Sequence, residues 1–296
     1  MTKNSNLRTA KKSKNDEFYT QYTDIEKELR FYTEYFEGKV VYCNCDDYQQ
    51  SNFYKYFYYN FHYLKLKKLI TTGYKADDNG LYAIYDGQIE TTGKLNGDGD
   101  FRSEECIEYL KQADVVVTNP PFSLFREYIK QLMDYNKKFI IIGNQNAITY
   151  KEIFPYIKNN QLWLGMNFVK SFEKPNGDIQ KFGNISWFTN IENKRRNEKL
   201  DLYKRYSFED YPKFDNFDAI NVDKTSDIPM DYDGIMAVPI TFLDKYCPTQ
   251  FEIIDINPHF FSIVEQGLPK PKQLTLHNVG KKDPYARILI KKIQQR

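Results

Sequence analysis

A short apolar run that stops at two prolines, near the middle of the chain, most strongly constrains the fold. Residues Asp114 to Thr118 contain three consecutive valines and no polar alternation, which predicts a buried strand of a parallel sheet. Pro120 and Pro121 end this strand, because a proline has no N–H to donate to a strand ladder. Ser123 is then expected to begin an amphipathic helix. Ligands of open α/β sheets bind at such strand ends, so this turn is the first candidate site.

Further buried strands alternate with helices along the first part of the chain. The predicted strands cover residues 39–45, 68–72, 139–143 and 183–189. The predicted helices begin at a capping box at Thr23, at Ser51 and at Ser103, and a β-hairpin is predicted over 81–95. We therefore expect an α/β protein with a doubly wound, mostly parallel sheet in three layers. Residues 170–182 are expected to form a mobile loop, and the pattern becomes irregular after about Asn190, where we place the domain change.

The turn Asn119-Pro120-Pro121-Phe122 carries groups suited to methylating an exocyclic amine of a nucleobase. The lone pair of such an amine is delocalised into the ring. The Asn119 side-chain oxygen and the Pro120 carbonyl could accept the two amine hydrogens and draw the lone pair out of conjugation. Phe122 offers a face on which an extruded base stacks. The alternative is structural, with Asn119 only capping the following helix.

Composition and charge limit the class of protein. No stretch approaches about 18 apolar residues and the start is polar and basic, so we expect a soluble cytoplasmic protein. Cys43 and Cys45 lack a second ligand pair, and the three histidines form no catalytic group, so we expect no metal. Residues 1–14 carry five Lys or Arg and residues 270–296 carry eight, which suits contacts to phosphate. The alternative is a pair of solvated tails.

Five segments together resemble the EcoRI-type adenine-N6 DNA methyltransferases of type II restriction–modification systems. These segments are KNDEFYT at 14–20, VYCNCDD at 41–47, GDGDFRS at 97–103, TNPPFSLFR at 118–126 and PITFL at 239–243. The likeness extends from about Lys11 to Arg287, and the order of the motifs is the one called gamma in this family. It implies a Rossmann-like fold of the class I methyltransferases, S-adenosylmethionine as methyl donor, a C-terminal DNA-recognition region, and a catalytic turn at Asn119, Pro120, Pro121 and Phe122.

The resemblance also assigns the donor site. It implies contacts to the donor from Phe18, Tyr19, Thr20, Cys43, Asn44, Cys45, Asp46, Asp100, Phe101 and Asn119. Asp100 would accept a hydrogen bond from the donor's adenine amine, and Phe101 would line the adenine ring. The segment 43–45 lacks the glycines usual at this place, and Gly73 stands where many relatives carry a ribose-binding acid, which leaves the ribose partner open. The alternatives are a tight polar turn at 97–101 and a hydrophobic staple at 18–20.

Contacts to DNA are expected mainly from the region after residue 190. The candidates are Phe122, Trp187, Lys194, Arg195, Arg196, Asn221 and Lys224. Trp187 is either the second wall for an extruded base or a core tryptophan. The basic stretch at 194–205 either binds phosphate and guanine or forms a solvated face. The expected organisation is a basic arm over 1–15, a donor-binding catalytic domain over 16–190 and a target-recognition region over 191–296.

Three hypotheses remain open on the sequence alone. The first is a site-specific DNA adenine-N6 methyltransferase that protects host DNA from a cognate restriction endonuclease. The second is an RNA or guanine-N2 methyltransferase using the same turn, and the third is a non-catalytic nucleic-acid-binding protein that retains the fold. The extent of the resemblance favours the first, and the intact Asn119 disfavours the third. We expect double-stranded DNA as partner, a monomer, no membrane contact, and an endonuclease that is a functional rather than a physical partner.

Overall fold

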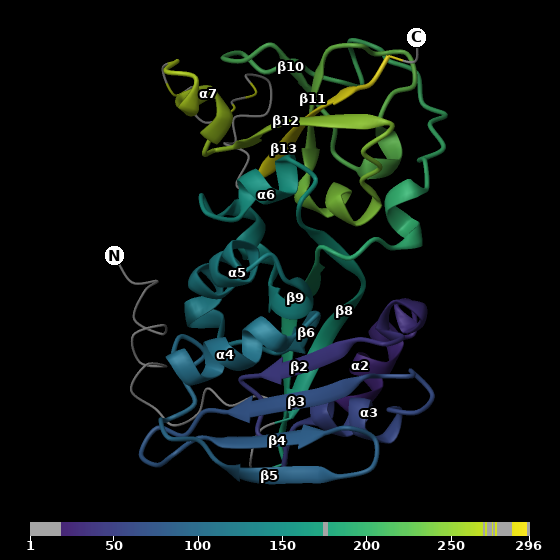
Figure 1. Cartoon of the computed structure of the whole chain (residues 1–296). Coiled ribbons are helices and arrows are strands. Elements are labelled where there is room, and N and C mark those ends of the chain that lie inside the picture. The colour runs from purple at the N-terminus through teal and green to yellow at the C-terminus, as the bar shows by residue number, and fades with distance from the viewer. Residues whose placement is uncertain are drawn as a thin grey trace. The chain divides into compact units, whose positions relative to one another are not determined.

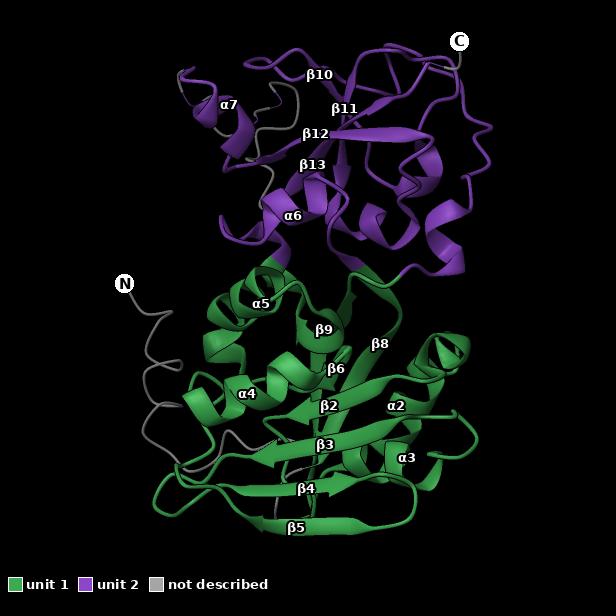
Figure 2. Ribbon diagram, viewed as in Figure 1, with its two compact units in different colours: residues 1–147, 164–191 green, residues 148–163, 192–296 purple. Residues whose placement is uncertain are grey.

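The structure, a computed structural model, describes residues 19–173, 177–268, 270, 274, 276 and 286–294. The expected basic arm, Phe18 and most of the basic segment after residue 270 lie outside the described residues. By its internal contacts the chain divides into two compact units (Figure 2). Unit 1 comprises Met1–Ala147 and Leu164–Ile191, and unit 2 comprises Ile148–Trp163 and Glu192–Arg296. A short segment inside the sequence of unit 1 therefore belongs to unit 2.

Unit 1 is built on a nine-stranded mixed sheet (Figure 1). In sheet order its strands are β1 (Tyr19–Thr20), β8 (Trp163–Glu173), β9 (Ile179–Thr189), β7 (Lys138–Asn144), β6 (Val115–Thr118), β2 (Val40–Asn44), β3 (Lys68–Gly73), β4 (Leu81–Tyr85) and β5 (Glu90–Lys94). Strands β7, β6, β2 and β3 pair in parallel, because helices return the chain to the same edge between them. The pairs β3–β4, β4–β5, β7–β9 and β1–β8 are antiparallel.

Helices cover both faces of this sheet (Figure 1). On one face, helices α2 (Tyr22–Leu29) and α3 (Asn52–Tyr59) bury Ile25 and Phe57 against a cluster that includes Val41 and Val117. On the other face lie α4 (Glu104–Gln112) and α5 (Phe125–Asp134), where Tyr109 meets Tyr42 and Phe125 meets Phe188. Alternate residues of the central strands are therefore buried on opposite faces, as their uninterrupted apolar runs require.

Most predicted elements of unit 1 are present, and the α/β class is confirmed. Ser51 caps α3 by accepting from the N–H groups of Phe53 and Tyr54, and Ser103 caps α4 by accepting from Cys106. The hairpin β4–β5 is also as predicted.

Four expectations were wrong in detail. The sheet is mixed rather than mostly parallel, because the hairpins add antiparallel strands on both sides of the parallel core. Thr23 lies inside α2, whose N-cap Gln21 makes no side-chain cap bond. The expected loop at 170–182 is largely strand, since β8 continues to Glu173 and β9 begins at Ile179. A short 3₁₀ turn, η2 (Phe122–Leu124), precedes α5, because the prolines delay the start of the α-helix.

Unit 2 contains a second sheet where the sequence pattern predicted irregular chain. Its order is β10 (Ala219–Asn221), β11 (Ile235–Pro239), β13 (Arg287–Lys292) and β12 (Phe251–Asn257). Only β10 and β11 pair in parallel among the described strands of this sheet. Its short helices are α6 (Phe154–Lys158), η4 (Lys194–Asn197), η5 (Thr225–Asp227), η6 (Ile240–Lys245) and α7 (Phe261–Glu265). Within the described residues, no helix has the length and apolarity needed to cross a membrane.

Candidate active site

The candidate site lies where the connections of the parallel strands diverge. Strand β2 pairs with β3 on one side and with β6 on the other. The chain therefore extends the sheet to one side of β2 first, and later crosses over to extend it on the other side. The carboxyl edge at such a switch point is the usual place for a ligand in an open α/β sheet. The loops that follow β2, β5 and β6 hold the predicted donor and catalytic segments, so the fold brings these segments together.

The loop after β2 is held in an unusual backbone conformation. Cys45 has φ +63°, in the left-handed region that glycine normally occupies. Gly73 at the end of β3 allows Asp47 of this loop to approach closely, since a Cβ on Gly73 would lie 2.7 Å from the Cα of Asp47. Asp47 forms an ion pair with Lys75, with 2.8 Å between Oδ2 and Nζ. Cys45 thus takes a backbone conformation that glycine adopts without the steric cost of a side chain.

Asp46 is buried and joins the loop after β2 to the turn after β6. Its Oδ1 accepts from Ser51 Oγ at 2.7 Å, its Oδ2 contacts Thr118 Oγ1, and its carboxylate also accepts from the backbone N–H of Asn119. Burial raises the pKa of Asp46 to about 7, and the hydrogen bonds from Thr118, Ser51 and Asn119 oppose this rise without cancelling it. The carboxyl group therefore changes its charge near neutral pH.

The remaining residues of the β2 segment make internal contacts. Cys43 is fully buried in the core against α2 and α3. Asn44 is 1% exposed and accepts a hydrogen bond from the Tyr128 hydroxyl. Burial raises the pKa of both Cys43 and Cys45 well above the usual value of a thiol, so neither thiol ionises near neutral pH.

Asp100 lies on the loop after β5, next to the end of β3. Its Oδ1 accepts from Nε of Arg102 at 2.9 Å, and its Oδ2 accepts from Nη2 at 2.6 Å. Arg102 also donates to Glu127 of α5 at 2.9 Å. The hydrogen bond from Arg102 lowers the pKa of Asp100, which stays ionised. Phe101 is 3% exposed and packs edge-to-face on Tyr128, with 5.0 Å between the ring centroids.

The predicted catalytic turn follows β6 directly. Asn119 is partly exposed, Pro120 is buried and Pro121 is exposed. Phe122 is partly exposed and packs edge-to-face on Phe172 of β8, with 6.2 Å between centroids. The turn therefore presents one amide and one aromatic side chain beside the buried Asp46.

Strand β1 joins the same region, while Trp187 does not. Tyr19 donates from its hydroxyl to Gln50, and Asn52 Nδ2 donates to the carbonyl of Thr20 at 2.8 Å, so β1 is tied to the loop after β2. Trp187 has no exposed surface and packs on Phe53 with 5.9 Å between centroids. This is the placement of a core tryptophan, the second of the two interpretations given above.

Unit 2 separates the predicted DNA contacts into exposed and buried side chains. Lys194 is exposed and Arg195 partly exposed. Arg196 is 8% exposed, with its guanidinium 3.4 Å from the centroid of the Trp163 ring. It also donates to Asn160 Oδ1 at 3.3 Å. Arg196 thus stabilises the packing of unit 2 through its contact with the Trp163 ring. Because its side chain is buried, we do not expect it to contact phosphate.

The other two predicted DNA contacts in unit 2 also differ in exposure. Asn221 is 6% exposed and donates to Asp223 at 2.7 Å, whereas Lys224 is exposed. Only Lys224 of the two presents its side chain to solvent.

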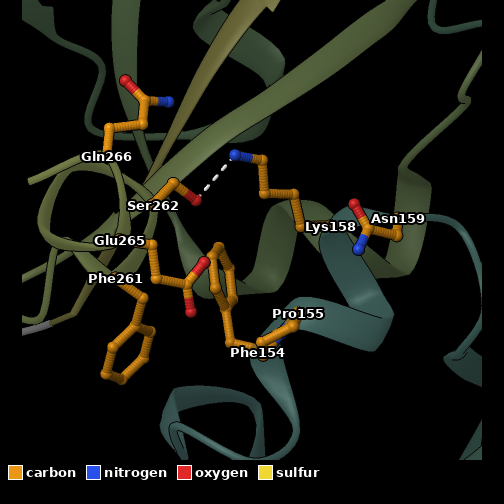
Figure 3. Close-up of a pocket in the computed structure, with 8 residues that line it drawn as sticks. All are labelled: Phe154, Pro155, Lys158, Asn159, Phe261, Ser262, Glu265 and Gln266. Carbon is orange, nitrogen blue, oxygen red and sulfur yellow. Dashed lines mark hydrogen bonds between the residues drawn. The ribbon is translucent and has the colours of Figure 1, made fainter.

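An open hollow of about 200 Å³ lies within unit 2, between α6 and α7 (Figure 3). Phe154 and Phe261 form one wall, and Lys158 donates to Ser262 Oγ at 2.6 Å. Its volume is below the roughly 300 Å³ at which small-molecule sites begin. None of the predicted site residues lines it. Among the described residues, no cluster of three or more potential metal ligands occurs.

Sequence reasoning missed three partners of the predicted residues. Arg102 and Tyr128 were given no role in the site, and Ser51 was expected only to cap a helix. Tyr128 meets Asn44 across 84 residues of sequence, so periodicity could not have found the pair. An arginine two residues after Asp100 was a usable local signal for an ion pair.

Comparison with known proteins gives the class to which the fold and the site belong. The family model of the adenine-specific methyltransferase EcoRI matches residues 6–93 and 77–293, and the chain therefore belongs to this family. The type II methyltransferase M.EcoRI of Escherichia coli is 48% identical over 97% of this chain and 96% of that protein.

Two mycoplasma proteins are also similar over nearly their full length. The type II methyltransferase M.MgeORF184P of Mycoplasma genitalium is 41% identical over 96% of this chain and 98% of its own. The type II methyltransferase M.MpnI of Mycoplasma pneumoniae is 39% identical over 96% and 97%. No solved structure gave a match. The predicted family, enzyme class and methyl donor, S-adenosylmethionine, are thus confirmed.

Proposed function

We propose that this chain methylates N6 of an adenine extruded from duplex DNA, at the carboxyl edge of β2 and β6. The observation that carries the proposal is a hydrogen-bonded link at this edge. Asp46, in the loop after β2, is hydrogen-bonded to Thr118 and to the N–H of Asn119, where the turn Asn119–Phe122 begins. The family to which the chain belongs is one of adenine-specific methyltransferases. The parallel core with helices on both faces supports a Rossmann-like arrangement of the donor-binding unit.

The residues near β2 and β3 fit the groups of S-adenosylmethionine. When bound, the donor supplies a methyl group on a positively charged sulfonium. The carboxylates of Asp47 and Asp100 suit its ammonium, ribose hydroxyls and adenine amine. Thr20 Oγ1 is buried without a hydrogen-bond partner in the described part of the chain, so a polar ligand atom would satisfy it. Tyr19, Cys45 and Phe101 would complete the surroundings of the donor.

The turn after β6 would act on the target base. The Asn119 side-chain oxygen and the Pro120 carbonyl accept the two hydrogens of the adenine amine, which localises its lone pair for attack on the methyl group. Phe122 stacks on the base. After transfer, the amine nitrogen is positively charged and its proton is lost to solvent.

The proposed DNA contacts of unit 2 are its exposed basic side chains. Lys194, Arg195 and Lys224 are exposed or partly exposed, whereas burial removes Arg196 and Asn221 from this set, and Trp187 from the base pocket. Functionally, we keep a basic arm over 1–15, a catalytic domain over 16–190 and a recognition region over 191–296. The modified DNA would resist a cognate restriction endonuclease.

A nucleoside digest tests the function directly. Duplex DNA and structured RNA are incubated with labelled donor and either wild-type protein or Asn119→Ala, then digested and separated. We expect N6-methyl-2′-deoxyadenosine from duplex DNA and no labelled nucleoside from RNA. We expect at least tenfold less of this product with Asn119→Ala, because Asn119 acts mainly in the transition state. Label in RNA or in guanine supports the alternative hypotheses, and near-normal activity of Asn119→Ala removes the turn from catalysis.

Base extrusion has its own readout. Extrusion costs a few kcal/mol, which stacking on Phe122 would offset. A 2-aminopurine at the target position should brighten when the protein binds, and more so with Phe122→Ala because ring stacking no longer quenches it. A co-crystal with the target adenine still stacked in the duplex would contradict this step.

A further inference from the structure

The contacts of Asp46 differ from those expected of a donor ligand. Three hydrogen-bonding groups already face its carboxyl group, namely Ser51 Oγ, Thr118 Oγ1 and the N–H of Asn119. Its own backbone is also fixed, because its N–H donates to Thr72 O at 2.9 Å and its carbonyl accepts from Thr71 Oγ1 at 2.6 Å. The residue is 9% exposed. Both its backbone and its side chain therefore already have hydrogen-bond partners within the protein.

These contacts lie where the ladder between β2 and β6 ends. The two strands pair at Val41 with Val115 and at Tyr42 with Val116. Further toward the carboxyl edge, side chains take over: Thr118 Oγ1 contacts the carbonyl of Asn44 as well as Asp46. Asp46 is thus a direct link between the end of β2 and the first residue of the catalytic turn.

We propose that Asp46 is a positioning residue, which fixes the backbone of Asn119 for methyl transfer, and is not a ligand of the methyl donor. The inference rests on the catalytic role proposed for Asn119. Asn119 is held on both sides, since Asp46 binds its N–H and Pro120 restricts its conformation through the following peptide. The side-chain torsions are then the main freedom left to the amide. Displacement of a reacting group by about 1 Å can cost about 100-fold in rate.

The contacts of the Thr118 hydroxyl indicate which groups donate and which accept in the link between Asp46 and Thr118. It has one hydrogen but touches two oxygens, Asn44 O and Asp46 Oδ2. A carbonyl only accepts, so both contacts are hydrogen bonds when the Asp46 carboxyl carries a proton and donates to Thr118 Oγ1. Thr118→Val, which keeps the shape and removes the hydroxyl, therefore weakens the same link from the other side.

The test separates the rate of transfer from donor affinity. Single-turnover methylation of duplex DNA at saturating donor is measured alongside calorimetric binding of S-adenosylhomocysteine. For Asp46→Ala we expect a rate about 100-fold lower, with the dissociation constant within about threefold of wild type. Asp46→Asn, which keeps an acceptor oxygen, should lose about tenfold or less. A tenfold weaker affinity with a normal rate at saturation would make Asp46 a donor ligand and overturn the proposal.

Asp114 supplies the matched control. It lies at the opposite end of the same strand pair, where its Oδ2 accepts from the N–H of Val40 at 2.8 Å. Asp114→Ala should keep the wild-type rate, and an equal loss there would mean general loosening of the strands, which overturns the proposal.

Thr118→Val and Asp46→Asn cover the case in which Asp46→Ala does not fold. If Asp46→Ala does not fold, Thr118→Val carries the test, and a wild-type rate for both Thr118→Val and Asp46→Asn refutes it. Activity of Asn119→Ala would refute the proposed function and this inference together. A normal rate of Asp46→Ala beside an inactive Asn119→Ala would refute the inference alone.

Discussion

At the scale of single residues, the carboxylate of Asp100, for which we propose a contact to the adenine amine of the donor, is already oriented by its neighbours. Arg102 holds both of its carboxylate oxygens, and Glu127 holds Arg102 in turn. Each carboxylate oxygen has two lone pairs, so Oδ2 still has room for the amine of an adenine. The pair therefore orients the carboxylate without filling it.

We predict that Asp100→Ala weakens binding of S-adenosylhomocysteine by about 1–3 kcal/mol, because it removes a hydrogen bond to a charged acceptor. Calorimetric titration measures the change. Lys94→Ala is the control, since it breaks an exposed ion pair with Asp78 and should leave donor affinity unchanged. An unchanged affinity for a folded Asp100→Ala protein would place the adenine pocket elsewhere.

A second residue-scale prediction concerns the pH dependence of stability. The folded-state pKa of Asp46 is raised from 3.8 to about 7, so its stabilising effect is complete below pH 4 and is lost as pH rises through about 7. The full effect has an upper limit of roughly 4 kcal/mol. The charge of Asp47, which is paired with Lys75, adds to the rise in the pKa of Asp46. The nearby side chains of Cys43, Cys45 and Tyr128 stay neutral in this pH range.

Urea unfolding of wild type and Asp46→Asn between pH 4.5 and 8 measures this effect. The difference in unfolding free energy should fall as pH rises through about 7 and level off as pH approaches 8. The other acids with raised pKa values, Asp24, Glu28 and Asp244, affect both proteins equally. A difference that grows with pH would mean that the folded protein stabilises the charged form of Asp46.

At the scale of elements, a buried carboxylate fixes helix α2 to strand β8. Glu28 accepts from the N–H groups of Met166 and Asn167, each at 2.8 Å, and from the Tyr32 hydroxyl at 3.1 Å. It has no exposed surface. The strand that carries Phe172, against which Phe122 packs, therefore depends on a side chain of α2.

We predict that Glu28→Ala lowers the free energy of unfolding by more than about 2 kcal/mol, because several buried donors lose their acceptor. Denaturant unfolding measures the loss. Glu37→Ala is the comparison, since its ion pair with Lys65 is exposed and should contribute within about 1 kcal/mol. Equal effects of the two substitutions would contradict the structural role of Glu28.

For the whole molecule, the distribution of basic residues matters more than the net charge of +2. We predict that Lys194→Ala makes the negative slope of log affinity for DNA against log salt shallower by about 0.9, which is the effect of losing one phosphate contact. Thermal stability should not change. Arg196→Ala should instead lower thermal stability, because Arg196 stacks on Trp163. Fluorescence anisotropy over a salt series, with thermal melts, distinguishes them. A changed slope for Arg196→Ala with a normal melt would reverse the assignment.

The sequence by itself determined the local elements and the family. Uninterrupted runs such as Val115–Val117, caps such as Ser51 and Ser103, and the break at Pro120 act over a few residues, so their effect can be predicted without the rest of the chain. Only the tertiary structure decided which polar groups meet. The fold brings distant segments together and buries the resulting contacts, as in the pairs Asn44 with Tyr128, Asp46 with Thr118 and Arg196 with Trp163. The second sheet also appeared only there, because short strands are stabilised by partners far along the chain rather than by their own pattern.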